Sequence, residues 1–439
     1  MTKETDYLII GAGAMGIAFA DEIFTRKPKL RLTLVDRRPQ AGGHWNDAYP
    51  YVKLHQPAAF YGVNSMELGS GSGDLSSKDE ILAYYSKVMD KFAASGRVEF
   101  LSEHDYLGNG QVINLYQPDE VINYKINKRL VDATYMKVEV PATSQPKYEV
   151  HEGVSLLPLN DLVKEYDQWE KFYVIGNGKT GMDAILFLLE KGVKPESIHW
   201  ICPNQAWLFN RDFVRVGDVG KEILKHVVLL SKASKVDDIF LPLEKEGGIT
   251  RINPSSLPSK WRCATVNPHE IEQLRRIKQV IQKGRINQIS PNTIHLQEGT
   301  VTFSGRALFV DCSANGLSKR EKTPIFTKDT ITLQSILFCQ QVFSAATIAR
   351  LALSNLSDKT RNKLTAVPHP EWKEDWPSAV SVSIENLLLL HRFFPMWMFR
   401  SRLNFMSHEP MMNYFASSVK AMLYVSSVRK AVERLKHKT

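Results

Sequence analysis

Two short apolar runs along the chain, residues 7–10 and 172–175, each end at a glycine-rich turn. An unbroken apolar run of this length, bounded by turn residues, is typical of a strand buried on both faces of a parallel sheet. After each turn the apolar residues take helical spacing, and a further apolar run ends at Asp36 in the first case and at Pro203 in the second. The repeated order of strand, turn, helix and strand predicts two α/β units in one chain.

The first turn has the spacing G-x-G-x-x-G, formed by Gly11, Gly13 and Gly16. The first glycine permits a tight turn, the second lets the backbone approach a pyrophosphate, and the third lets the helix pack close to the strand. Ala14 lies where the helix begins, and free N–H groups there would face the phosphates. Asp36 follows Gly16 by 20 residues, where an acid accepts hydrogen bonds from an adenosine ribose. The sequence therefore predicts a dinucleotide site.

The second turn repeats this spacing with Gly176, Gly178 and Gly181. Lys179 and Thr180 lie inside it, where a cation and a hydroxyl could help to hold a phosphate. A Walker loop is excluded, because it needs four residues between its glycines before the lysine. The sequence predicts a second dinucleotide site here.

No acid stands near residue 201, at the end of the strand that follows the second turn. An aspartate at that place would bind a 2′-hydroxyl and repel a 2′-phosphate, so its absence favours NADPH, with NADH left open. Arg211, like Lys179, is a candidate cation for the extra phosphate, and an ordinary surface charge is the alternative for each.

A second glycine pair follows Asp36, in the element Gly42-Gly43-His44-Trp45. With the two glycine turns, this element makes the chain resemble the flavoproteins with two dinucleotide-binding domains. It most resembles the flavin-containing and Baeyer–Villiger monooxygenases, which carry GG-x-W after the FAD ribose acid. The resemblance implies that the first turn binds FAD, with Arg37, Gly43 and Trp45 among the contacts.

Residues 46–76 form a long segment rich in Pro, Gly, Ser and aromatic residues, and long loops in compact domains are usually functional. The resemblance implies that this loop runs beneath the flavin ring, with the amide of Gln56 facing it. A surface loop with a packed histidine is the alternative. The sequence identifies no catalytic residue, and the candidates are His44, Asp47, His55 and Gln56, of which His44, Asp47 and His55 could act as a base.

Segments 128–136 and 307–317 echo each other, because each is an apolar strand that ends in an aspartate and small residues. In the resembling families such segments lie where the chain crosses between domains. Asp132 and Asp311 are helix or turn caps or, alternatively, flavin ligands, and Asp311 is counted among the cofactor candidates.

The expected fold class is α/β, with two Rossmann-like dinucleotide-binding domains, the second inserted in the first. The FAD domain would comprise residues 1–150 and 305–350, and the NAD(P) domain residues 165–304. Residues 351–439 form a helical C-terminal region of unknown role. Local patterns also predict a helix opened by a capping box at Ser77 and Glu80, and a hairpin over residues 111–126.

Composition limits the other classes of protein. A hydrophobic content of 43% and a charged content of 23% are ordinary for a globular protein. The net charge of +9 is densest in the tail SVRKAVERLKHKT, so peripheral membrane contact is left open, although a solvated helix end explains it as well. Positive charge interleaved with aromatic residues is lacking, which argues against nucleic acid as a partner.

The N-terminal residues show no signal-peptide pattern, so we expect none, and the apolar stretch NLLLLHRFFPMWMF is too short and too interrupted to span a bilayer, so it predicts a core helix. The four cysteines Cys202, Cys263, Cys312 and Cys339 form no CxxC pair. We expect four free thiols, no metal site, no redox-active dithiol and a cytoplasmic location, outside the disulfide reductase branch.

One motif of flavin-containing monooxygenases, F-x-G-x-x-x-H-x-x-x-Y/F, is not matched. Counted from Gly153, its histidine position is Leu157 and its aromatic position is Asp161. The leading hypothesis is an FAD-dependent, NAD(P)H-oxidising monooxygenase that acts through a C4a-peroxyflavin, with dioxygen and a small organic molecule as substrates. The alternatives are a flavin dehydrogenase, oxidase or halogenase on the same fold, and a non-catalytic redox-sensing scaffold that binds FAD or nucleotide.

Overall fold

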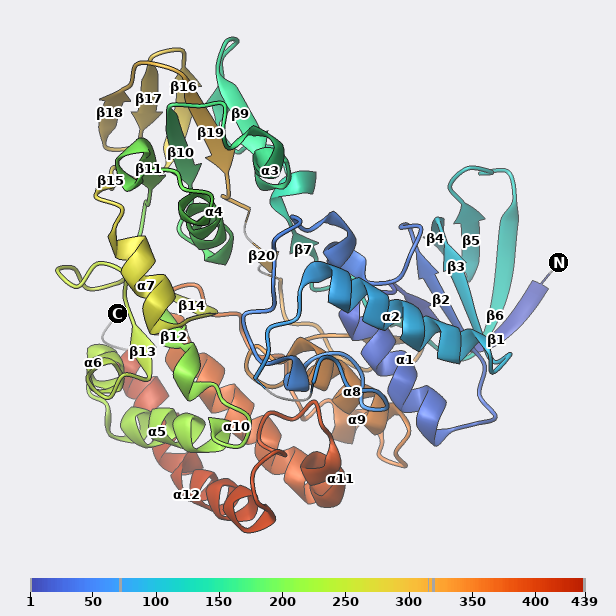
Figure 1. Ribbon diagram of the computed structural model, residues 1–439. Coiled ribbons are helices and arrows are strands. Elements are labelled where there is room, and N and C mark those ends of the chain that lie inside the picture. Colours follow the sequence, from blue (N-terminus) through green and yellow to red (C-terminus); the bar gives the residue numbers. More distant parts are fainter. Residues whose placement is uncertain (1, 71–72, 315, 318–319, 437–439) are drawn as a thin grey trace.

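The computed structural model describes residues 2–70, 73–314, 316–317 and 320–436. A seven-stranded sheet contains the first glycine turn and lies on the right of Figure 1. Its strands β1, β2, β3, β6 and β21 are parallel; β5 pairs antiparallel with β6 as the predicted hairpin, and β4 pairs antiparallel with β5. The strands are β1 (Thr2–Ile10), β2 (Leu32–Asp36), β3 (Val98–Ser102), β4 (His104–Gly108), β5 (Gln111–Asn114), β6 (Val121–Asp132) and β21 (Thr330–Thr332).

A second sheet of five parallel strands, at the upper left of Figure 1, contains the second glycine turn. Its order is β15-β11-β10-β19-β9. These are β9 (Ser155–Pro158), β10 (Lys171–Ile175), β11 (Ile198–Ile201), β15 (Gln279–Ile281) and β19 (Ala307–Asp311).

Both faces of the second sheet are covered, which explains why its inner strands are apolar throughout. Helices α4 (Lys179–Glu190) and α7 (Pro268–Arg275) pack on one face. The strands β16 (Ile286–Ser290), β17 (Thr293–Leu296) and β18 (Gly299–Thr302), with β8 (Glu149–Val150), form a four-stranded sheet against the other.

The pairing corrects one boundary. The sequence placed the strand of residues 307–311 in the returning part of the first domain, yet this strand is β19 and lies between β10 and β9 in the second sheet. The chain returns to the first sheet only at β21. A short apolar strand that ends in aspartate suits either sheet, so its composition could not choose between them. The two crossings of the chain lie side by side, because β7 (Val138–Glu139) pairs with β20 (Gly316–Leu317).

Three helices pack against the first sheet and its glycine turn. Helices α1 (Ala14–Arg26) and α8 (Gln341–Ala352) pack together, with buried residues on nearly every side, while α2 (Lys78–Ala93) begins with the predicted capping box. Ser77 and Glu80 each bond the other's backbone, as a capping box requires. Of residues 46–70 and 73–76, the stretch 57–63 is buried and contains a 3₁₀ turn at Ala58–Phe60, while residues 69, 70, 73 and 74 are exposed.

The C-terminal region joins the two halves of the molecule. Helices α10 (Trp376–Phe393), α11 (Pro395–Arg400) and α12 (Met411–Lys436) lie below both sheets in Figure 1. Helix α11 packs into the core of the first sheet, while α10 and α12 share a core with α5 (Val219–Lys232), α6 (Asp237–Lys245) and the small sheet β13-β12-β14. Its strands are β12 (Ala206–Asn210), β13 (Ile249–Thr250) and β14 (Lys260–Val266), and two further one-turn helices are α3 (Leu162–Glu165) and α9 (Asp358–Arg361).

The apolar stretch of residues 386–399 is a core segment, as predicted. Leu390 and Met398 are fully buried, and Pro395 starts a new helix where α10 ends. Within the described part of the chain, none of the helices has both the length and the apolar character that crossing a membrane requires.

Candidate functional site

The first glycine turn has the geometry that its spacing predicts. Gly11 has φ of +101°, which an L side chain rarely adopts. A Cβ on Gly16 would lie 2.0 Å from the carbonyl oxygen of Gly11, so only glycine lets α1 approach the turn this closely. A Cβ on Gly13 would meet only Gly43, with 3.4 Å to its Cα, which is an ordinary contact. Gly13 is therefore not required by packing within the protein.

Helix α1 begins without a cap. Gly13 occupies its N-cap position, no side chain of the described residues accepts from its first N–H groups, and its first turn holds no acid. Three other helices are capped by Ser77, Asn267 and Ser357. Uncapped N–H groups and the positive end of the helix dipole make such a terminus a site for an anion.

Asp36 ends β2 beside this turn and is buried, with 6% of its surface exposed. Its carboxylate accepts hydrogen bonds from the backbone N–H of Ala12 at 2.7 Å and of Arg38 at 2.9 Å. The carboxylate thus lies next to the glycine turn, as a ribose-binding acid must. Arg37 instead points to the surface and pairs with Asp105, with 2.6 Å between Nη2 and Oδ2.

The second glycine pair packs directly on the first turn. The N–H of Gly42 donates to the carbonyl oxygen of Ala12 at 2.8 Å. A Cβ on Gly43 would lie 2.8 Å from the Cα of Gly13, so the two backbones touch. The GG-x-W element therefore forms one wall of the predicted pyrophosphate site.

The residues that follow this pair are buried around it. Trp45 donates from Nε1 to the hydroxyl of Tyr61 at 2.7 Å, and its ring stacks on His44. Burial, with Arg38 nearby, lowers the pKa of His44 to about 4. Asp47 is paired with Arg38, whose Nε lies 2.9 Å from its Oδ2. His44 is therefore neutral near pH 7, and Asp47 is held by a cation.

The second glycine turn repeats the geometry of the first. Gly176 has φ of +113°, and a Cβ on Gly181 would lie 2.1 Å from the carbonyl oxygen of Gly176. Gly178 is the N-cap residue of α4, which again lacks both a side-chain cap and an acid in its first turn within the described chain. A Cβ on Gly178 would have no atom of the described chain within 4 Å. The space in front of this turn is open.

The polar residues of the second turn are already engaged in part. Lys179 pairs with Asp183, one turn along α4, and the hydroxyl of Tyr49 donates to the same carboxylate. Thr180 is half-buried in the first turn of the helix. Lys179 therefore lies at the predicted phosphate site with an acid beside it.

Cys202 occupies the place that Asp36 holds in the first sheet. Val35 pairs with Ile10, just before the first turn, and Ile201 pairs with Ile175, just before the second. The residue after each partner is therefore Asp36 in one sheet and Cys202 in the other. Burial raises the pKa of Cys202 to about 12, so this position is neutral.

Arg211 lies in a short 3₁₀ turn after β12 and is held by the protein. Its guanidinium pairs with Glu270, with 2.8 Å between Nη2 and Oε2, and donates to the carbonyl oxygens of Thr265 and His55. A role in binding a 2′-phosphate stays a prediction, and it would compete with Glu270.

Asp132 at the end of β6 and Asp311 at the end of β19 each accept a hydrogen bond from the backbone N–H two residues later. Asp132 accepts from the N–H of Thr134 at 2.8 Å, and Asp311 accepts from the N–H of Ser313 at 2.9 Å. Each strand lies beside a glycine-turn strand, so the echo in the sequence reflects equivalent places in the two sheets. Asp311 accordingly lies near the second turn, and its part in binding a cofactor stays a prediction.

A cavity of about 110 Å³ lies among the loop of residues 46–76, the β12–β14 sheet, α5, α10 and the segment before α8. It contains both residues that were predicted to lie near a flavin ring, His55 and Gln56. The wall is mostly aromatic and aliphatic. The lining residues are His55, Gln56, Phe60, Phe209, Phe213, Val214, Val219, Glu222, Ile223, His226, Gly248, Cys263, Thr265, Phe338, Cys339, Gln340, Trp376 and Phe405.

Two histidines of this cavity are neutral. Burial lowers the pKa of both His55 and His226 to about 3, with cationic neighbours adding to the effect. Nδ1 of His226 accepts from Nε1 of Trp376 at 3.2 Å, while Nδ1 of His55 is buried without a hydrogen-bond partner among the described residues. Neither imidazole is protonated near pH 7.

The expectation of four free thiols is wrong. Cys263 of β14 and Cys339, just before α8, form a disulfide across 76 residues of sequence, while Cys202 and Cys312 are free and buried. The CxxC rule detects only cysteines that are close in sequence, and this pair is brought together by the tertiary fold. Because two of the four cysteines are paired, the cysteines no longer support a reducing compartment, and they no longer exclude a redox-active dithiol.

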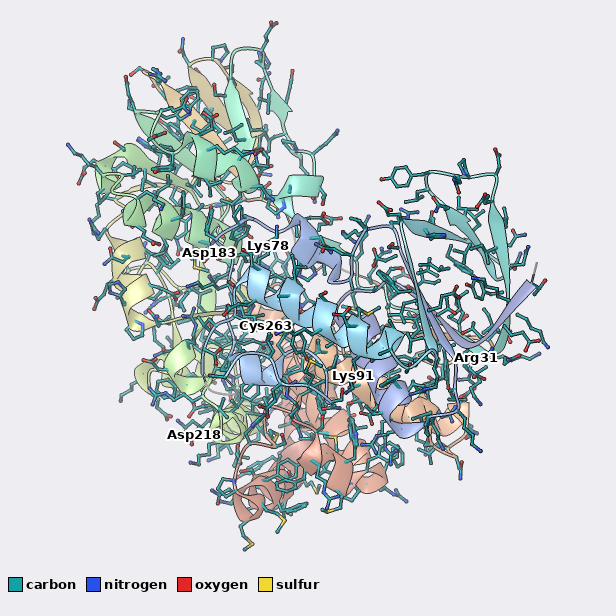
Figure 2. The ribbon with its side chains drawn as sticks, turned by 45° about the vertical axis from the view of Figure 1, so that its right-hand side comes forward. Arg31, Lys78, Lys91, Asp183, Asp218 and Cys263 are labelled. Atoms are coloured by element: carbon teal, nitrogen blue, oxygen red, sulfur yellow. A yellow bond between two sulfur atoms is a disulfide. The ribbon has the colours of Figure 1, made fainter. Side chains whose placement is uncertain are left out.

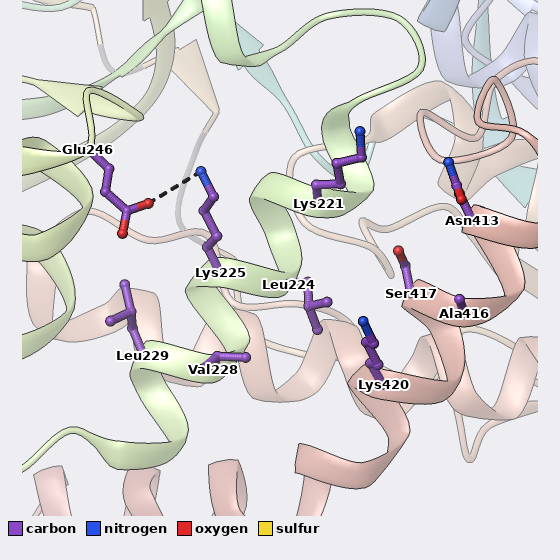
Figure 3. Close-up of a pocket in the computed structure, with 10 residues that line it drawn as sticks. All are labelled: Lys221, Leu224, Lys225, Val228, Leu229, Glu246, Asn413, Ala416, Ser417 and Lys420. Carbon is purple, nitrogen blue, oxygen red and sulfur yellow. Dashed lines mark ion pairs between the residues drawn. The ribbon is translucent and has the colours of Figure 1, made fainter.

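A second hollow, a groove of about 450 Å³, lies between α5 and α12 (Figure 3). Leu224 and Val228 line it from α5, Lys420 faces them from α12, and Lys225 pairs with Glu246 at its edge. Of the described residues that line it, none was predicted as a site residue. The cavity beside the disulfide is therefore the candidate reaction site.

No protein-family model matches the chain. An uncharacterized protein of Mycobacterium tuberculosis is 40% identical over 392 residues, which cover 85% of this chain and 72% of that protein. This chain belongs to the same family. The probable FAD-binding monooxygenase AlmA of Acinetobacter baylyi is 30% identical over 101 residues, 23% of the chain and 20% of AlmA.

Solved structures show the same fold at low identity. Cyclohexanone monooxygenase bound to epsilon-caprolactone matches with a TM-score of 0.51 and 13% identity, over 83% of this chain and 88% of that one. OTEMO in complex with FAD and NADP matches with a TM-score of 0.50 and 14% identity, over 82% and 85%. The resemblance to flavin-containing and Baeyer–Villiger monooxygenases is thus confirmed for the fold, and OTEMO binds the two cofactors that the sequence predicts.

Proposed function

We propose that the protein is an FAD-dependent oxidoreductase that oxidises NAD(P)H and acts as a monooxygenase on a small organic substrate with dioxygen. One observation carries the proposal: two helices, α1 and α4, begin uncapped at glycine turns, each at the carboxyl end of a buried parallel strand. Ligands of open α/β sheets bind at that edge. The proposal assigns the two sheets to two Rossmann-like domains.

The residues of the first turn fit FAD. The N–H groups at the start of α1 would hold the pyrophosphate, and the buried carboxylate of Asp36 would accept from the ribose hydroxyls. Gly13 and Gly43 leave only backbone at this point, so a phosphate can come close. We assign Gly11, Gly16 and Trp45 to shaping this site, and Gln56 to the flavin ring.

The residues of the second turn fit a nicotinamide dinucleotide. The open space in front of Gly178 would take its pyrophosphate. Cys202, neutral and at the place of Asp36, would not repel a 2′-phosphate, which favours NADPH. Lys179 and Arg211 are the proposed cations for that phosphate, each in exchange for its present carboxylate partner.

When bound, the cofactors supply hydride transfer and the activation of dioxygen, and the protein supplies their placement. The cavity contributes an apolar wall that excludes water, formed by aromatic side chains such as Phe209, Phe338 and Trp376. Its histidines are neutral, so they can accept or donate a hydrogen bond without adding charge. The cavity is suited to a small, mostly apolar substrate.

The test is to mix the purified full-length protein with NADPH without oxygen and then to admit air. The proposal predicts that the flavin absorbance bleaches, and that a blue-shifted transient precedes reoxidation. Bleaching followed by immediate reoxidation would contradict the monooxygenase and favour an oxidase or reductase. A flavin that stays oxidised with both NADPH and NADH would overturn the oxidoreductase and favour a non-catalytic scaffold. Gly178→Ala, in which we expect weaker NADPH binding with FAD retained, is the matched control and should still bleach with dithionite.

A further inference from the structure

The disulfide lies in the wall of the candidate reaction cavity and not in a packed core. Both Cys263 and Cys339 are half-buried and line that cavity, together with His55. The two free cysteines behave differently, because burial raises the pKa of Cys202 to about 12 and raises that of Cys312 well above the ordinary value of a thiol. Buried thiols of that kind are inert, whereas sulfur at a cavity wall is open to chemistry.

The disulfide also joins the two halves of the molecule at the edges where the glycine turns lie. Cys339 lies between β21 and α8. Strands β21 and β1 both run parallel to β6, so the chain that follows β21 leaves the first sheet at its carboxyl edge, and Cys339 belongs to that edge. Cys263 lies in β14, which pairs in parallel with β12. Strand β12 follows the carboxyl end of β11 after a short link. Figure 2 shows Cys263 near the middle of the molecule.

The surroundings of the disulfide have features of a reactive site. Phe338, next to Cys339, has φ of +41°, and such left-handed backbone at a bulky residue is concentrated at functional sites. Gln340 on the other side is 8% exposed and lines the cavity, and its Oε1 has no hydrogen-bond partner among the described residues. The buried Nδ1 of His55 is similarly unpartnered within that part of the chain. Both atoms are free to hydrogen-bond to water or to a molecule in the cavity.

We propose that Cys263–Cys339 is a redox-active disulfide that takes up an electron pair from reduced flavin at the first turn. The S–S bond breaks, and two S–H bonds form from two electrons and two protons. The reduced flavin anion gives both electrons and one proton and returns to oxidised FAD, and the second proton comes from water. The inference rests on the proposed function, and it gives the protein a second two-electron store.

The experiment counts electrons and thiols in the full-length, FAD-loaded protein. NADPH is titrated without oxygen, the protein is alkylated with N-ethylmaleimide in denaturant, and the peptides are mapped by mass. We expect two NADPH per FAD, with label on Cys202 and Cys312 before reduction and on all four cysteines after it. Cys339→Ser should consume one NADPH per FAD, and deflavinated protein should keep its disulfide.

Two results would overturn the inference while the proposed function stands. Either one NADPH bleaches the flavin and Cys263 and Cys339 stay unlabelled, or both are labelled before any reductant is added. If NADPH does not bleach the flavin, the bound flavin is reduced by light instead. Label on Cys263 and Cys339 then supports the inference although the nicotinamide site fails, and the absence of label overturns the inference. Protein that binds no FAD overturns both proposals.

Discussion

The two glycine turns have nearly the same backbone geometry, but the residues around them differ. In each, the first glycine has φ above +100° and the third has no room for a Cβ beside the carbonyl oxygen of the first. They differ at two places. Gly43 covers Gly13, whereas the space around Gly178 is open, and Asp36 in the first sheet is replaced by Cys202 in the second. The backbone makes an anion site in both, and the neighbouring residues select the ligand.

The largest effect is expected where the two turns are identical. Gly16→Ala and Gly181→Ala each place a Cβ near 2 Å from a backbone oxygen, at 2.0 and 2.1 Å. Each oxygen belongs to the glycine that directly follows a buried strand, where the backbone has little room to move, so the cost should reach or exceed the upper end of the about 1–3 kcal/mol typical of overpacking. Thermal melting and the yield of folded protein measure it. Gly178→Ala is the matched control and should melt like the wild type, and equal losses in both would contradict this account of the turns.

The covalent link between the two halves should have the next largest effect. Opening the Cys263–Cys339 disulfide frees a loop of 76 residues, and the loss of such a link typically costs about 2–5 kcal/mol. Cys263→Ser should therefore lower the melting temperature in the absence of reductant. Dithiothreitol should lower that of the wild type and leave that of the variant unchanged. A wild-type melting curve that is insensitive to dithiothreitol would contradict the link.

The difference between Asp36 in the first sheet and Cys202 at the equivalent place in the second is tested by placing an acid at residue 202. Cys202→Asp should raise the affinity for NADH and lower that for NADPH, because the carboxylate binds a 2′-hydroxyl and repels a 2′-phosphate. One charge-assisted hydrogen bond corresponds to a shift in preference of about 10-fold or more. The ratio of kcat/KM for the two cofactors measures it. Cys202→Asn keeps the shape without the charge, and an equal shift in both variants would remove charge as the cause.

The neutral histidines around the two sites give an effect on the pH dependence of stability, and it is smallest when taken for a single histidine. Burial lowers the pKa of His44 to about 4 and those of His55 and His226 to about 3, against an ordinary value of 6.5. Below pH 6.5 the unfolded chain binds the extra protons. The free energy of unfolding should therefore fall as the pH drops from 6.5 toward 4, by about 1.4 kcal/mol per pH unit for each histidine. Denaturation at pH 7.5 and 5.5 measures this fall in the free energy of unfolding. The fall should be smaller in His55→Gln, and an equal fall would contradict a contribution from His55.

What the sequence predicted well depends on neighbours along the chain. Both glycine turns, the capping box of α2 and the antiparallel hairpin follow from local spacing, and the structure confirms their geometry. The resemblance to the monooxygenase fold rested on the same short motifs. These motifs are local because a tight turn or a helix cap needs only residues within a few positions of one another.

What it missed depends on contacts between distant segments. The disulfide, the pairing of Arg211 with Glu270 and the place of β19 in the second sheet all require the tertiary fold. The C-terminal helices carried no motif, although they share a core with α5 and help to enclose the cavity. The similarity of the two strands that end in aspartate was recognised correctly, but the strand of residues 307–311 was assigned to the wrong sheet. Equivalent places in two similar sheets look alike in sequence.

The central claim is that the two turns divide the work, with FAD at the first and the nicotinamide dinucleotide at the second. The most direct measurement compares bound FAD per chain and the Kd for NADP⁺ in the wild type, Gly13→Ala and Gly178→Ala. In each variant the new Cβ is tolerated by the protein and enters only the ligand's space. We predict that Gly13→Ala loses most of its FAD, while Gly178→Ala keeps its FAD and binds NADP⁺ about 10–100-fold more weakly. Full FAD in Gly13→Ala, or unchanged NADP⁺ binding in Gly178→Ala, would contradict the claim.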